Sequence, residues 1–62
     1  MEITRVIQYF TEVGEAGFDR EASSGNGAYY VRLYNGSYDA TGFDTLAEAI
    51  AELDYEIGRA HV

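Results

Sequence analysis

The chain of 62 residues contains no cysteine, no proline and no tryptophan, and its four basic residues are all arginine. Without cysteine it can form no disulfide, no thiolate metal site and no cysteine nucleophile. Its apolar runs are far shorter than the roughly 18–20 residues of a membrane-spanning helix, and no basic segment leads into an apolar run as in a secretory signal. We therefore expect a protein that acts in the cytoplasm.

Positive charge is scarce as well. Four basic residues stand against eleven acidic ones, which gives a formal net charge of −7. Nucleic acid and anionic lipid would repel such a chain, so we expect neither as a direct partner. A basic protein surface is the partner that this charge favours. The length allows one small domain, residues 1–62, which we expect to be monomeric.

The N-terminal segment has helical apolar spacing. Because a glycine in the left-handed conformation often ends a helix, the pattern predicts a first helix from Ile3 to a stop at Gly17. The residues that carry the pattern are Ile3, Val6, Ile7, Phe10 and Val13.

The middle of the chain predicts three strands, at residues 18–23, 28–34 and 37–43. Asn35-Gly36 is typical of a tight type I′ turn, which would pair Arg32 with Asp39 and Val31 with Ala40. An earlier turn at residues 25–26, or one residue later, joins the first two strands. The turn at 25–26 places Asp19 opposite Arg32 and Phe18 opposite Leu33.

A second helix begins at Thr45-Leu-Ala-Glu48, which has the form of a capping box, and Gly58 is suited to end it. Its apolar stripe consists of Leu46, Ala49, Ile50, Leu53 and Ile57. The expected fold is therefore α+β, a two-layer αβββα domain with a three-stranded antiparallel meander and both helices on one sheet face. That face would carry Phe18, Tyr29, Val31, Leu33 and Tyr38, and the open face Asp19, Glu21, Tyr30, Arg32, Tyr34, Asp39, Thr41 and Phe43.

Residue patterns that support catalysis are weak. The single histidine, His61, is next to the C-terminus and has no nucleophile or acid near it in sequence. The segment Asp39-Ala-Thr-Gly-Phe-Asp44 lacks the alternating acids of a calcium-binding loop. We therefore expect a protein that is not an enzyme and that has no cofactor and no metal site.

The acidic residues of the second helix are regularly spaced. Asp44, Glu48, Glu52 and Glu56, the acidic row, recur at steps of four and would form one stripe. Each like-charge pair at this spacing costs roughly 0.2–0.5 kcal/mol. One interpretation is a solvated face that increases solubility. The other is a row of carboxylates that imitates the phosphates of a nucleic-acid strand and competes for arginine and lysine sites.

A second candidate surface lies on the open sheet face. Its aromatic residues either cover one another across strands or act as interface anchors, because tyrosine is frequent at binding hot spots. This sheet surface consists of Asp19, Glu21, Asp39, Tyr30 and Tyr34.

A very small, acidic, lysine-free chain with the row Asp44–Glu48–Glu52–Glu56 resembles, over its whole length, the phage anti-CRISPR proteins that mimic DNA. The resemblance implies an inhibitor that binds a CRISPR surveillance complex in the host bacterial cell and blocks target DNA. In type I systems such proteins often occupy the basic groove or the PAM-reading surface of the large subunit. PAM reading is the step at which protein, rather than guide RNA, contacts DNA.

Part of the chain is also similar to the strand–strand–helix core of the HicB antitoxin family. The residues concerned are 27–34 and Thr41-Gly-Phe-Asp-Thr-Leu-Ala-Glu-Ala49. That resemblance implies a partial RNase H fold that neutralises a small basic toxin ribonuclease. The spacing from Gly42 to Asp44 differs from the family pattern by one residue, and the DNA-binding domain of the family is missing. A third interpretation is an accessory domain without a strong partner.

Overall fold

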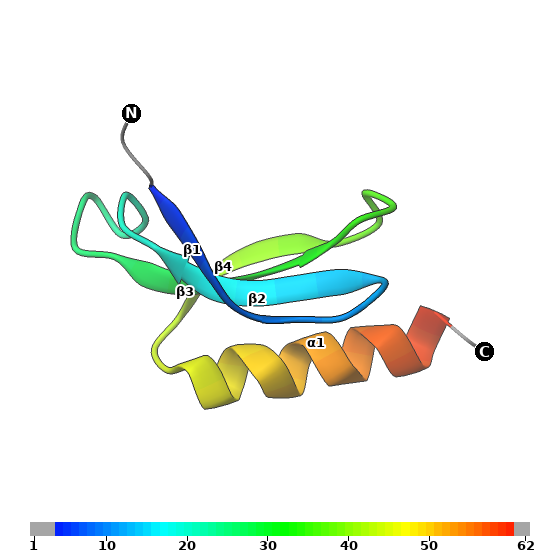
Figure 1. Ribbon diagram of the computed structural model, residues 1–62. Coiled ribbons are helices and arrows are strands. Elements are labelled where there is room, and N and C mark those ends of the chain that lie inside the picture. Colours follow the sequence, from blue (N-terminus) through cyan, green and yellow to red (C-terminus); the bar gives the residue numbers. More distant parts are fainter. Residues whose placement is uncertain (1–3, 61–62) are drawn as a thin grey trace.

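The protein is an α+β domain with one sheet layer and one helix layer. The computed structural model describes residues 4–60. They form β1 (Arg5–Phe10), β2 (Gly14–Asp19), β3 (Ala28–Leu33), β4 (Asp39–Phe43) and α1 (Leu46–Ala60). The strands make an antiparallel meander in the order β1-β2-β3-β4, and α1 lies across one face of it (Figure 1). The α+β class is confirmed, with four strands and one helix in place of three and two.

The expected first helix is wrong. Its segment, from residue 4 onward, forms β1, a tight turn and the start of β2 (Figure 1). The turn is held by Thr11, whose hydroxyl oxygen accepts hydrogen bonds from the amides of Val13 at 3.2 Å and Gly14 at 3.1 Å. The Thr11 amide in turn donates to the Gly14 carbonyl at 2.7 Å.

A bulge in β1 explains the misleading periodicity. The register of β1 against β2 shifts between Ile7 and Tyr9. One extra residue reverses the alternation of faces, so side chains three apart share a face. Val6 and Tyr9 lie on the helix side, opposite Phe18 and Ala16. The resulting spacing of three is the spacing that an amphipathic helix would show.

The loop between β2 and β3 is longer than expected. β2 ends at Asp19, which pairs with Ala28, and residues 20–27 form the connection. Left-handed backbone conformations shape this loop: Ser23 has φ 56° and Ser24 has φ 59°. The expected pairing of Asp19 with Arg32 is therefore wrong by four residues. Because four is even, every side chain keeps its face.

The hairpin of β3 and β4 has the expected register, with Arg32 opposite Asp39 and Val31 opposite Ala40. The turn differs from type I′, because only Gly36 of the Asn35-Gly36 pair has a positive φ, at 80°. A second bulge, where Gly42 has φ 100°, shifts the register so that Phe43 faces Tyr29. Phe43 thus packs on the helix side, and its expected place on the open face is wrong.

The core lies between the sheet and α1. Thr45 caps the helix as expected, because its hydroxyl accepts from the Glu48 amide at 3.2 Å. Gly14 lets the helix approach β2, since a Cβ there would lie 3.0 Å from a Leu53 methyl group. Within residues 4–60 no helix is both long and apolar enough to cross a membrane. The buried centre of the core consists of Ala16, Val31, Leu33, Ala49 and Leu53.

Candidate protein-binding surfaces

The acidic row does not form one straight stripe. Four residues advance an α-helix by 400°, so each step of four turns the row about 40° around the axis. Asp44 precedes α1 and is exposed, as is Glu48, whereas Glu52 and Glu56 turn toward the sheet and are partly buried. The structure therefore divides the row into an exposed half and a half that contacts the sheet.

The two carboxylates near the sheet have partners. The Tyr38 hydroxyl donates a hydrogen bond to Glu52 at 2.7 Å. This bond, followed by partial burial, raises the pKa of Tyr38 to about 12. Glu56 pairs with Arg59 at 3.5 Å. The bond to Glu52 joins α1 to the end of the β3–β4 hairpin, whereas the Glu56–Arg59 pair lies within α1.

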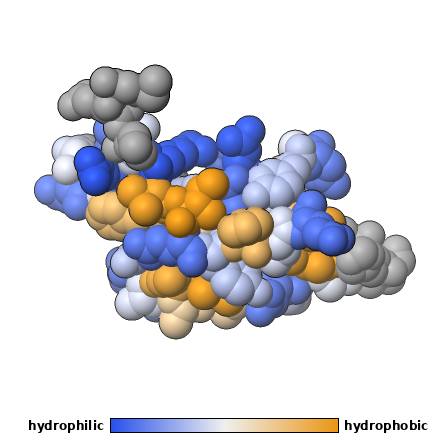
Figure 2. All heavy atoms as spheres, viewed as in Figure 1, coloured by the Kyte–Doolittle hydropathy of each residue, from blue (hydrophilic) through white to orange (hydrophobic). Residues whose placement is uncertain are grey.

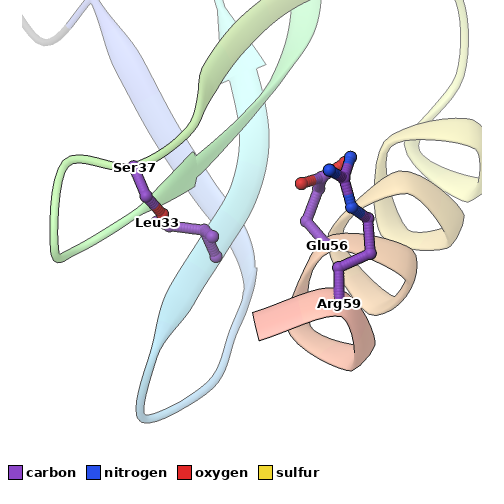
Figure 3. A pocket seen from close by; sticks show the side chains of 4 residues that line it. All are labelled: Leu33, Ser37, Glu56 and Arg59. Carbon is purple, nitrogen blue, oxygen red and sulfur yellow. The ribbon is translucent and has the colours of Figure 1, made fainter. Parts of the chain in front are cut away.

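A hollow of about 230 Å³ lies beside this contact. Figure 3 shows Leu33 and Ser37 on its sheet side and the paired Glu56 and Arg59 on its helix side. Because the charges that line it already neutralise each other, the hollow has no unpaired group to hold a charged ligand.

The exposed carboxylates at α1 are Asp44, Glu48 and Asp54, here called the acidic helix surface. Ion pairs within residues 4–60 join Arg5 to Asp19 and Arg59 to Glu56, so none involves this surface. Asp54 was outside the predicted acidic row, whose members are four residues apart, because it is only two residues from Glu52. It is exposed, whereas Glu52 and Glu56 are partly buried.

The acids of the sheet surface differ in accessibility. Asp19 is mostly buried; it lies 3.5 Å from the Arg5 guanidinium and accepts a hydrogen bond from the Glu21 amide at 3.0 Å. Glu21 is exposed in the loop after β2, and Asp39 is exposed opposite Arg32. The structure thus does not gather these three acids into one anionic site.

Tyr30 is on the open face as expected, but it is fully buried rather than exposed. Its neighbour across the strands is Gly17, which has no side chain. The Arg5 guanidinium covers the ring at 4.9 Å from its centroid. The Tyr30 hydroxyl donates to the buried Glu15 carboxylate at 2.5 Å. Burial and this bond both raise the pKa of Tyr30.

Tyr34 remains half-exposed at the end of β3. Partial desolvation and the nearby Glu15 carboxylate raise its pKa. Its amide donates to the Val13 carbonyl at 2.9 Å, which places it beside the β1–β2 turn. Together with three exposed apolar residues it forms what we call the apolar patch: Ile7, Phe10, Val13 and Tyr34.

Sequence reasoning missed Glu15, Ile7 and Phe10 because it assigned them to a helix. The segment Arg5–Phe10 is rich in β-branched and aromatic residues, a composition that favours a strand. That composition was the available signal for β1. The position of Glu15 opposite Arg32 follows only from the register of the sheet.

A metal site would need several ligating side chains close together. Among residues 4–60 no group of three or more histidine, cysteine, aspartate or glutamate side chains is arranged to hold a metal ion. His61 lies outside the described residues.

Comparison of the chain with protein-family models, with curated proteins and with solved structures finds no match.

Proposed function

We propose that the protein is a non-enzymatic inhibitor that covers a basic nucleic-acid-binding surface of another protein by presenting DNA-like negative charge. The specific form we propose is an anti-CRISPR protein that blocks target-DNA or PAM binding by a type I CRISPR surveillance complex. The observation that carries the proposal is the set of exposed carboxylates without an ion-pair partner in residues 4–60: Glu12, Glu21, Asp39, Asp44, Glu48 and Asp54.

The acidic helix surface is the main contact in this proposal. Glu48 and Asp54 are six residues apart, which is about 9 Å along the helix axis and about 120° around it, so they lie on the two flanks of the solvent-exposed side of α1. The axial component of this spacing corresponds to roughly two to three phosphate steps of one DNA strand. The helix holds them on a rigid scaffold, so little conformational entropy is lost when they meet arginine or lysine side chains.

The first test is capture of the target. Immobilised protein is incubated with a bacterial host lysate at low and at high salt, and bound proteins are identified by mass spectrometry. We expect a nucleic-acid-binding protein that is retained at low salt and released at high salt, because ion pairs on a surface are screened. Recovery of no basic protein at either salt concentration would contradict charge mimicry.

The second test locates the surface. Glu48→Lys with Asp54→Lys reverses the acidic helix surface, and Glu12→Lys with Glu21→Lys makes the same change of net charge elsewhere. Inhibition of target-DNA binding by a type I complex, measured by gel shift, should fall at least tenfold more in the first variant. Equal loss in both variants would mean that only overall charge matters, and no loss in the first would exclude α1 as the contact.

An antitoxin of the HicB kind is the second candidate function. The order β3, β4, α1 supports it, because residues 27–49 form two antiparallel strands followed by a capped helix. This alternative also requires a basic partner, but that partner is a small ribonuclease. Rescue of growth when the protein is co-expressed with a neighbouring toxin gene would favour it over the inhibitor.

A further inference from the structure

The open face of the sheet carries most of the exposed large hydrophobic side chains in the described residues. Among the described residues, four of the five large hydrophobic side chains that are exposed belong to the apolar patch: Ile7 (52%), Phe10 (72%), Val13 (43%) and Tyr34 (49%). Figure 2 shows hydrophobic residues gathered over β1, the edge strand from which two of them come. Concentration of such residues on one side of a monomer marks an interaction surface.

The central side chains of this face are held by contacts within the chain itself. Tyr30 is held by Glu15 on one side and covered by Arg5, which itself is tied to Asp19. Glu15 and Tyr30 have their polar atoms satisfied, so the face can be covered without leaving either group unpaired. A preorganised surface loses little entropy on association.

The open face is also less acidic than the helix side of the molecule. Its ionisable side chains include two arginines and three carboxylates, a formal charge of −1, whereas the whole chain carries −7. A strongly basic partner would be drawn to the helix side rather than to this one. Two copies of the same chain, by contrast, repel each other least when their open faces meet. The charged residues of the face are Arg5, Arg32, Glu15, Asp19 and Asp39.

We propose that the open sheet face binds the same face of a second copy of this chain, with the apolar patch at the contact. Packed sheets lie about 10 Å apart, and each helix layer lies about 10 Å beyond its sheet. The two α1 helices would therefore be on opposite outer surfaces, roughly 30 Å apart. At physiological salt this is several times the Debye length of about 8 Å, so their carboxylates repel each other little.

The size of the face sets the strength of the contact. Four strands spaced about 4.8 Å apart and about 20 Å long give a footprint of roughly 400 Å². Stable complexes bury about 800 Å² of accessible surface per partner. The dimer is therefore weak and depends on concentration, in contrast to the monomer that composition alone predicts.

Sedimentation equilibrium of the full chain, from about 10 µM to about 1 mM, tests the proposal. We expect the average mass to rise from 6.9 kDa toward twice that value as concentration increases. The variant Ile7→Thr with Phe10→Ser should weaken self-association at least tenfold. Tyr55→Ser is the matched control, because Tyr55 is 61% exposed on α1, away from the open face. It should self-associate as the wild type does.

The dimer and the proposed inhibitor function are expected to respond to salt in opposite directions. Between about 0.01 M and about 0.15 M, added salt screens the repulsion between two acidic copies and should strengthen the dimer, whereas it should weaken capture of a basic partner. Self-association can therefore be absent while capture of a basic partner is found, and the reverse. A constant mass of 6.9 kDa up to about 1 mM would overturn the dimer.

Folding of the double variant is checked by far-ultraviolet circular dichroism. If it does not fold, a dilution series of the wild type followed by amide NMR shifts decides the matter. Chemical shifts of open-face residues that change on dilution support the dimer. Changes confined to α1, or no changes at all, overturn it.

Discussion

At the scale of single residues, the same kind of hydrogen bond occurs on both faces of the sheet: a tyrosine hydroxyl donates to a glutamate carboxylate. Tyr30 binds Glu15 on the open face, and Tyr38 binds Glu52 against the helix. A hydrogen bond to a charged acceptor contributes roughly 1.5–3 kcal/mol where both groups are sheltered. These bonds allow an acidic chain to place two of its carboxylates close to the core without cations.

The Tyr38–Glu52 pair predicts a loss of stability at alkaline pH. The pKa of Tyr38 rises from an ordinary value of 10.0 to about 12 in the folded protein, so folding favours the protonated hydroxyl. Its contribution is complete below about pH 10, the pKa of the unfolded chain, and is lost as pH rises through about 12. Urea midpoints measured from pH 8 to pH 12 should fall across this window.

Two phenylalanine variants identify the source of that fall. Tyr38→Phe should make the decline shallower, because it removes one of the hydroxyls whose ionisation is penalised. Tyr55→Phe removes a hydroxyl from an exposed ring and should leave the decline as it is. An identical pH profile in Tyr38→Phe and wild type would show that the bond to Glu52 does not contribute.

The candidate protein-binding surfaces were only partly predictable from the sequence. Spacing in the sequence identified the exposed acids Asp44 and Glu48 because helical periodicity near a capping box is reliable. It could not show that Glu52 has a partner, since Tyr38 lies fourteen residues from it. The burial of Tyr30 depends on Gly17 and Arg5, which reach it only through the register of β1 and β2.

At the scale of elements, close approach of β1 to β2 depends on Gly17. A Cβ at this position would meet the backbone of Val6 and Ile7, which cannot move away as a flexible side chain could. Gly17→Ala should therefore lower the free energy of unfolding by about 1–3 kcal/mol, the usual cost of overpacking. Chemical denaturation followed by circular dichroism measures it.

Gly58 is the matched control for that substitution. It lies within α1, and a Cβ there would meet no atom within 4 Å. Gly58→Ala should raise the free energy of unfolding by about 0.5–1 kcal/mol, because alanine has the higher helix propensity. Opposite signs for the two variants are the expected result. Stabilisation by Gly17→Ala would mean that β1 does not pack against β2 as described.

The fold itself was predictable where local signals agree and not where a bulge intervenes. The Asn35-Gly36 register and the Thr45 cap depend on neighbouring residues and are confirmed. The bulges in β1 and β4 change which face a side chain occupies, and a single sequence gives no direct sign of them. Both large errors, the N-terminal helix and the exposed Phe43, come from these bulges.

At the scale of the whole molecule, negative charge works against a small fold. The longest dimension is 36 Å, close to the Debye length of about 30 Å at 0.01 M salt, so at low salt most carboxylates in the molecule repel one another. Unfolding relieves this repulsion because the chain expands. The net charge of −7 should therefore make stability depend strongly on salt.

We expect sodium chloride to raise the thermal midpoint by roughly 5 °C between about 0.01 M and about 0.2 M, equivalent to about 1 kcal/mol. Most of the gain should occur below about 0.1 M, because screening saturates while salting-out effects continue to grow with concentration. The variant Glu48→Lys with Asp54→Lys reduces the net charge from −7 to −3 and should respond less. Differential scanning calorimetry of both proteins measures the effect. A midpoint that falls with salt would mean that the Arg5–Asp19 and Arg59–Glu56 pairs contribute more than the repulsion costs.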